Sequence, residues 1–303
     1  MRPRLTQEDA ALALARVTGS PSHRPADEDL ELLARPELRP VRLLLDYWKP
    51  ELGLADHGVL HTIVVFGSTR LLDPELARAR LADAEQSASR LPEDPGARDA
   101  LRRARCAADQ SRYYAIAHEF GRLVGCCGDG PDDHRLLIVT GGGPGAMEAA
   151  NRGAHDVGAA SVGLNITLPH EQEPNPYLTP DLHFSFRYFA LRKLHFMQRA
   201  RALVAFPGGY GTFDELFETL CLVQTGKRAA LPIVLVGREF WERAIDFDFL
   251  VERGVLDAEE LALFTFAESA AEIWAAIRGW YTERGRSLLE EPSASSNGDA
   301  SCS

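Results

Sequence analysis

The sequence predicts an α/β fold, namely a Rossmann-like, doubly wound parallel sheet with an N-terminal helical arm and a helical insertion after the first strand. Three observations lead to this prediction. Short, continuous apolar runs recur along the chain, amphipathic helical segments lie between them, and glycine loops follow several of the runs. Continuous apolar strands are typical of parallel sheets covered by helices on both faces, with right-handed crossover connections.

The N-terminal helical arm is predicted at residues 1–58. Short apolar periodic runs alternate there with prolines, which interrupt helices because they lack the backbone N–H donor. These prolines are Pro21, Pro25, Pro36, Pro40 and Pro50. We therefore expect short helices rather than one long helix in this part of the chain.

The Rossmann-like nucleotide-binding domain is predicted at residues 59–284. Its first strand, residues 61–66 (HTIVVF), precedes an Ala-, Arg- and Glu-rich helical insertion at about 73–110. Further strands are expected at 135–140, 161–166, 182–186, 202–206 and 231–236, and further helices at 146–157, 188–201, 212–225, 240–252 and 270–280. The Ser-, Glu- and Pro-rich residues 285–303 are expected to form a disordered tail.

Composition narrows the class of protein. Hydrophobic residues make up 45% of the 303 residues and charged residues 25%, as in ordinary soluble enzymes. A net charge of -11 argues against general binding to nucleic-acid phosphates, which requires a basic face. The chain has no apolar run of membrane-spanning length and no export signal, so we expect a cytoplasmic protein without a membrane partner.

The cysteines do not suggest a metal site. Their number is odd and they show no paired CxxC spacing, so neither a disulfide framework nor a zinc site is indicated. They are Cys106, Cys126, Cys127, Cys221 and Cys302. We expect buried small hydrophobic residues or incidental thiols, and no bound metal.

Three glycine-containing loops are expected at one edge of the sheet, because each follows a parallel strand. Glycine lets the backbone approach a ligand closely, and the free N–H groups of a helix start attract anions. A phosphate is the ligand that these loops favour, although tight strand-to-helix turns alone would also use glycine. The candidate binding residues are Gly67, Ser68, Gly141, Gly142, Gly143, Gly208, Gly209, Gly211 and Thr212.

Two common nucleotide motifs do not match. In a dinucleotide fingerprint an acidic residue follows GxGxxG by about 20 positions, but Asn165 stands near that position after Gly143 and Gly145. A P-loop requires GxxxxGK followed by Ser or Thr, but Gly226 and Lys227 are followed by Arg228. NAD binding and ATP hydrolysis are therefore poorly supported.

The remaining candidates for reactive side chains lie in residues 187–196 (RYFALRKLHF) and 207–215 (PGGYGTFDE). Arg192 lies on a helix with an otherwise apolar side, and Glu215 lies one turn into the helix that opens at the third glycine loop. Both side chains are candidates for one cleft, and a surface ion pair is the alternative interpretation.

These segments resemble the cytokinin riboside 5'-monophosphate phosphoribohydrolase ("Lonely guy") family, formerly mislabelled as lysine decarboxylases. Its hallmark PGGxGTxxE corresponds to residues 207–215, and its Arg-Lys pair to Arg192 and Lys193, fifteen residues before Pro207. Segments 141–154, 163–177 and 214–227 are similar to the longer bacterial branch, and the resemblance covers roughly residues 60–280.

The resemblance implies a reaction and a set of residues. Family members hydrolyse the N-glycosidic bond of nucleoside 5'-monophosphates to free base and ribose 5-phosphate, use no metal or cofactor, and form dimers or multiples of dimers. By resemblance, Arg192 and Glu215 are the catalytic pair, while Gly208, Gly209, Gly211 and Thr212 form the phosphate loop. Lys193, Gly67, Ser68 and residues 141–143 would complete the nucleotide site.

The resemblance leaves two questions open. Phe189 replaces a methionine that is common in short members of the family, so the choice between cytokinin ribotides and AMP is not decided. A related branch carries the molybdenum cofactor, and a nucleotide-like cofactor carrier without hydrolase activity is the alternative function. Lysine decarboxylation with pyridoxal phosphate has no support, because no feature of the sequence identifies a Schiff-base lysine.

Overall fold

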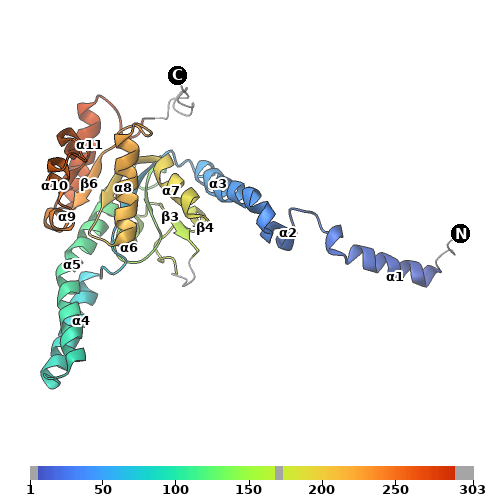
Figure 1. The fold of residues 1–303 in the computed structure, drawn as a ribbon, viewed down its shortest axis with the longest axis horizontal. Helices are drawn as coiled ribbons and strands as arrows, with labels where there is room; N and C mark the ends of the chain where they lie inside the picture. Colours follow the sequence, from blue (N-terminus) through green and yellow to red (C-terminus); the bar gives the residue numbers. More distant parts are fainter. Residues whose placement is uncertain (1–5, 168–172, 291–303) are drawn as a thin grey trace. The chain divides into compact units, whose positions relative to one another are not determined.

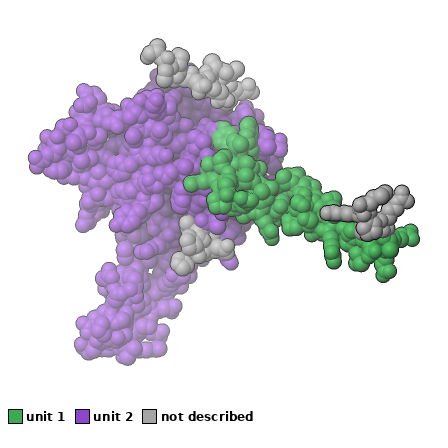
Figure 2. Space-filling view, turned by 45° about the vertical axis from the view of Figure 1, so that its right-hand side comes forward, with its two compact units in different colours: residues 1–49 green, residues 50–303 purple. Residues whose placement is uncertain are grey.

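The computed structural model describes residues 6–167 and 173–290 (Figure 1). The chain divides into two compact units, residues 1–49 and 50–303, which Figure 2 shows in different colours. The first unit contains the short helices α1 (Gln7–Thr18) and α2 (Leu30–Ala34) and the start of α3 (Arg39–Asp56). The end of α3 belongs to the second unit, where Leu54 packs in a hydrophobic core.

The second unit is built on a parallel sheet. Within the described residues it has seven strands in the order β4-β3-β2-β1-β5-β6-β7, and all neighbouring pairs are parallel. The strands are β1 (His61–Phe66), β2 (Leu136–Thr140), β3 (Ser161–Ile166), β4 (His183–Phe186), β5 (Ala200–Ala205), β6 (Ile233–Val236) and β7 (Thr265–Ala267). The predicted doubly wound parallel sheet is confirmed, and β7 is an addition whose three residues are too few to show a pattern.

The strand order reverses at β1. From β1 the chain proceeds outward through β2, β3 and β4, and it then returns to add β5, β6 and β7 on the other side of β1. The topological switch point therefore lies between β1 and β5. Ligands of open α/β sheets bind at the carboxyl ends of the strands that flank this point.

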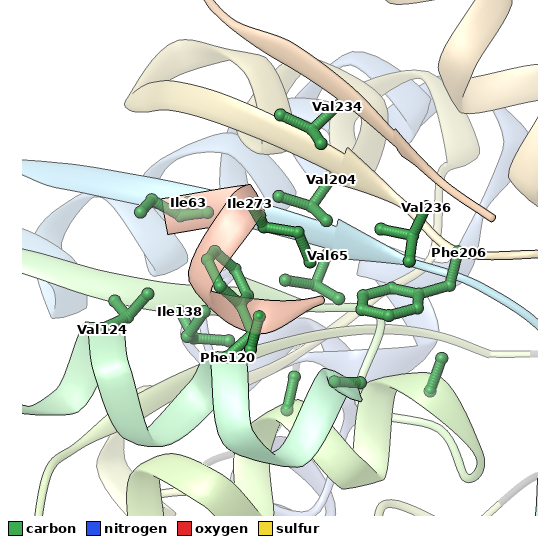
Figure 3. Packing of buried hydrophobic residues seen from close by; sticks show 14 of the residues in the cluster. Ile63, Val65, Phe120, Val124, Ile138, Val204, Phe206, Val234, Val236 and Ile273 are labelled. Carbon is green, nitrogen blue, oxygen red and sulfur yellow. The ribbon is translucent and has the colours of Figure 1, made fainter. Parts of the chain in front are cut away.

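Alternate residues of the strands enter two different cores. Ile63 and Val65 of β1 belong to a cluster with α5, α6 and α11, whereas Val64 and Phe66 belong to a cluster with α7, α8, α9 and α10. Figure 3 shows how the first cluster packs around the aromatic ring of Phe120. The helices are α6 (Ala146–Asp156), α7 (Phe189–Gln198), α8 (Tyr210–Gln224), α9 (Arg238–Ala244), α10 (Phe247–Glu252) and α11 (Ala270–Glu283).

The region after β1 forms two long helices, α4 (Pro74–Arg90) and α5 (Pro95–Gly125), which lie side by side (Figure 1). Asp73 and Asp94 cap their N-termini by accepting backbone hydrogen bonds. The second half of α5 packs on the sheet through buried residues that include Tyr113 and Phe120. The helical insertion is therefore continuous with a helix of the sheet layer.

Residues 285–290, the described start of the predicted tail, pack against the rest of the second unit. Leu288 and Leu289 pack against the first hydrophobic cluster, and the backbone carbonyl of Glu290 accepts a hydrogen bond of 2.6 Å from Arg201. Residues 291–303 lie outside the described residues. Among the helices of the described chain, none is both long and apolar enough to cross a membrane.

Candidate active site

The loops after β1, β2 and β5 converge at the switch point. The backbone N–H of Ser68 donates to the carbonyl of Pro207 at 3.0 Å, and the carbonyl of Ser68 accepts from the N–H of Ala146 at 3.1 Å. A Cβ atom on Gly67 would lie 2.6 Å from the Cβ of Ala146 and 2.8 Å from that of Phe206. Gly67 and Ser68 therefore join the two other loops, and only glycine fits at position 67.

The loop after β2 is held by a buried polar network. The Asn175 side chain donates to the carbonyls of Gly142 (3.2 Å) and Gly143 (3.1 Å), and it also contacts Asn151 Oδ1 at 3.1 Å. Thr140 Oγ1 accepts from the N–H of Gly142 and donates to Asn151. The loop is thus fixed by side chains from α6 and from the segment after β3.

Backbone conformation and limited space explain why this loop has glycines. Gly142 and Gly145 have φ values of +72° and +75°, which L side chains rarely adopt. A Cβ atom on Gly141 would lie 2.5 Å from an Arg192 guanidinium nitrogen. The glycines at these positions are therefore required by the fold and by the place that Arg192 occupies.

The loop after β5 leads directly into α8, with Gly209 as its N-cap residue. A Cβ atom on Gly208 would lie 2.1 Å from Thr212 Oγ1, whereas one on Gly209 or Gly211 would meet nothing within 4 Å. Thr212 is buried. Packing thus requires glycine at 208 but not at 209 or 211, where the backbone of the α8 N-terminus is open to a ligand.

Arg192 of α7 extends over the end of the sheet. Its Nε donates a 2.7 Å hydrogen bond to the carbonyl of Leu164 in β3, and its guanidinium lies over the Phe196 ring at 5.0 Å from the centroid. Burial lowers the pKa of Arg192 and the charge of Glu215 opposes this shift. The guanidinium is held in one place with terminal N–H groups directed to the Gly141 loop.

Glu215 is a buried carboxylate, only 7% exposed. Burial raises the pKa of Glu215 to about 7, against the charges of Lys193 and Arg192, which lower it. Among the described residues, its side chain has no hydrogen-bond partner and no ion pair within 4.0 Å. A carboxylate in such surroundings is a frequent feature of functional sites, because a structural role would pair it.

Lys193 lies next to the site but is engaged by other groups. Its Nζ lies 2.8 Å from Asp214 Oδ2 and 3.1 Å from Glu218 Oε2. Burial lowers the pKa of Lys193, but the hydrogen bonds to Asp214 and Glu218 outweigh it and leave the pKa above its ordinary value. The lysine expected to contact a nucleotide therefore joins α7 to α8.

The predicted residues from three loops and two helices are thus brought to one edge of the sheet. The sequence did not single out Thr140, Asn151 and Asn175, although Asn151 and Asn175 belong to the segments that carry the family resemblance. For Thr140 and Asn151 the signal available in the sequence was a short polar residue close to a glycine, whereas Asn175 has no glycine near it in the sequence. In the described part of the chain, no group of three or more His, Cys, Asp or Glu residues could hold a metal ion.

Two surface hollows lie apart from these residues. One of about 480 Å³ is lined by residues of α5 and α11 and of the segment that follows α11, including Trp274 and Arg278. Another of about 430 Å³ lies between α5 and α9. Neither includes a predicted site residue.

Comparison with known proteins finds similar sequences and a similar family model. Residues 147–277 match the family model described as "Possible lysine decarboxylase". The chain is 30% identical over 145 residues to "Probable cytokinin riboside 5'-monophosphate phosphoribohydrolase" of Oryza sativa subsp. japonica, covering 45% of this chain and 60% of the relative. It is 35% identical over 140 residues to "Pyrimidine/purine nucleotide 5'-monophosphate nucleosidase" of Escherichia coli (strain K12), covering 41% of this chain and 28% of the relative.

The chain therefore spans less than two thirds of the length of either relative. Among solved structures, a molybdenum cofactor carrier protein of Chlamydomonas reinhardtii is 18% identical, with a TM-score of 0.43, over 74% of this chain and 98% of that chain. A likeness of this degree adds nothing to the functional argument. Residues 147–277, less than half of the chain, are thus similar to the family described as "Possible lysine decarboxylase", and a cytokinin riboside 5'-monophosphate phosphoribohydrolase is among the similar proteins.

Proposed function

We propose that this chain hydrolyses the N-glycosidic bond of purine nucleoside 5'-monophosphates, either cytokinin ribotides or AMP, to free base and ribose 5-phosphate. The observation that carries this proposal is the unpaired, buried Glu215 carboxylate, one turn beyond an open helix N-terminus and within electrostatic range of Arg192. The names of the relatives support the same class of reaction.

The phosphate is assigned to the start of α8. The first N–H groups of a helix have no partner within the helix, and its dipole favours an anion there. Gly209 and Gly211 leave this backbone uncovered, and Gly208 keeps Thr212 close to the loop. The 5'-phosphate therefore anchors the substrate with its ribose toward Glu215.

Cleavage of an N-glycosidic bond passes through a ribosyl cation. A carboxylate beside the sugar stabilises this cation and orients water or the ribose hydroxyls, a role for ionised Glu215. The base leaves with excess electron density, which a fixed guanidinium stabilises electrostatically but does not protonate. Arg192 has this role toward the leaving base or the phosphate.

The test is direct. Purified protein is incubated in EDTA with AMP, N6-isopentenyl-AMP or adenosine, and the released base is measured by chromatography. We expect release from at least one monophosphate and little from adenosine, because adenosine lacks the anchoring phosphate. Comparable turnover of adenosine would refute the phosphate assignment, while no release from any monophosphate would favour the cofactor-carrier alternative.

The family resemblance also leads us to propose a homodimer or a multiple of dimers. Exposed apolar side chains on α7 and α8, namely Phe189, Leu194 and Phe217, offer surface for such contacts. Light scattering at micromolar concentration gives the mass, and a monomer would refute this assignment.

A further inference from the structure

One ion pair connects the immediate neighbours of the proposed catalytic residues, and a second ion pair links the same lysine to a residue further along α8. Lys193 follows Arg192 in α7, and Asp214 precedes Glu215 in α8. The Lys193 ammonium, whose side chain is 18% exposed, lies 2.8 Å from Asp214 and 3.1 Å from Glu218, one turn further along α8. A substrate phosphate would therefore have to compete with both carboxylates for this ammonium.

We propose that Lys193 is a positioning residue that ties α7 to α8 and sets the protonation state of Glu215, and that it does not bind the substrate phosphate. This inference rests on the proposed function of Glu215 as the ionised group of an N-glycosidase. It differs from the role that the family resemblance implies, in which Lys193 completes the nucleotide site.

The charges around Glu215 explain this role. Its burial raises the pKa most strongly; Lys193 and Arg192 lower it, and Glu218 and Asp214 raise it. Lys193 is thus a cation near the carboxylate and also neutralises the two acids that oppose ionisation. A neutral residue at position 193 removes the positive charge near Glu215 and leaves Asp214 and Glu218 without their cation. Both changes disfavour the ionised form of Glu215.

Removing the cation of the ion pairs and removing their two carboxylates should shift the pH dependence of kcat in opposite directions. Lys193→Met should move the acid limb of kcat to higher pH by about one unit, because Glu215 becomes harder to ionise. The double variant Asp214→Asn with Glu218→Gln should move it to lower pH, because Lys193 stays charged and two anions are lost. A purely structural role predicts loss of turnover in both variants without opposite shifts.

Substrate affinity separates positioning from phosphate binding. We expect Lys193→Met to change KM for AMP by less than about threefold, whereas loss of a phosphate contact would raise it by tenfold or more. Lys193→Arg keeps the positive charge and should restore the wild-type acid limb. A tenfold rise in KM, or acid limbs that coincide in all variants, would overturn the proposal.

A second measurement does not depend on turnover. The pKa of Glu215 is followed by NMR of ¹³C-labelled glutamate side chains, with Glu215→Gln identifying the resonance. Raised and lowered values in the two variants would support the electrostatic role even if no nucleotide were hydrolysed, in which case only the proposed function fails. An unchanged value beside normal AMP hydrolysis would overturn the role of Lys193 and leave the proposed function standing.

Discussion

The glycine loops after β2 and β5 occupy the same edge of the sheet, but their glycines are required for different reasons. In the first loop, Gly142 and Gly145 adopt positive φ values, and Asn175 binds the loop carbonyls. In the second loop, Gly209 and Gly211 have negative φ values and open space where a side chain would begin. The comparison indicates that the fold requires Gly142 and Gly145 of the first loop, whereas a ligand would require Gly209 and Gly211 of the second loop.

The largest expected effect lies just beyond the second loop, at Glu215. Glu215→Gln keeps the shape but removes the negative charge that stabilises the ribosyl cation, so turnover of a nucleoside monophosphate should fall on the order of 100-fold with little change in nucleotide affinity. Steady-state kinetics and equilibrium binding measure the two quantities.

The adjacent Asp214 is unsuitable as an unaffected control, because it pairs with Lys193. Glu239→Gln, in the first turn of α9, is a better match and should leave kcat unchanged. If Glu215→Gln retained near-normal turnover, the carboxylate would not stabilise the cation.

An alanine in the loop after β2 should lower the free energy of unfolding and not the affinity for the nucleotide. Gly145→Ala combines a positive φ with a Cβ position 2.2 Å from the Ser68 carbonyl oxygen, so the free energy of unfolding should fall by about 2–3 kcal/mol. Gly158→Ala is the matched control, since it has a positive φ with open space and should cost only about 1 kcal/mol. Denaturant unfolding compares them, and equal losses would show that the loop contact is unimportant.

The protonation of Glu215 should appear in the pH profile. Because its pKa is raised to about 7 and the ionised form is the active one, kcat should fall roughly tenfold between pH 8 and pH 6. The free energy of unfolding has the opposite dependence, since a raised pKa stabilises the fold at acidic pH and loses this contribution as pH rises through about 7. Turnover that stays constant over this range would contradict a requirement for ionised Glu215.

The smallest effect on stability is expected in the second loop. Gly211→Ala replaces a helical glycine without a steric clash, so the free energy of unfolding should rise by up to about 1 kcal/mol, while KM for the nucleotide should increase. Gly279→Ala in α11 is the control, because it is equally unhindered and far along the chain. If both variants gained stability and kept wild-type KM, the second loop would not contact the ligand.

The sheet and its loops were predictable because continuous apolar runs and glycines are local signals. The paired side chains were not, since the Lys193–Asp214 contact depends on how α7 lies against α8. The role of Asn175 was likewise not predictable, because its hydrogen bond to the Gly142 carbonyl depends on how the segment after β3 folds against the loop after β2. A single sequence shows which residues could react, but it does not show which of them are already occupied by a neighbour.

The pairing of β1 with β5 bears on how the site forms during folding. Thr62 pairs with Ala200, so strands from distant parts of the chain must meet before the switch point exists. A fragment limited to the family-matched residues 147–277 would contain Arg192 and Glu215 but neither β1 nor β2. Such long-range pairing forms slowly, because the chain loses conformational entropy before the two strands make stabilising contacts. Chains clipped so that they lack β1 would therefore hold both reactive residues and remain unable to use them.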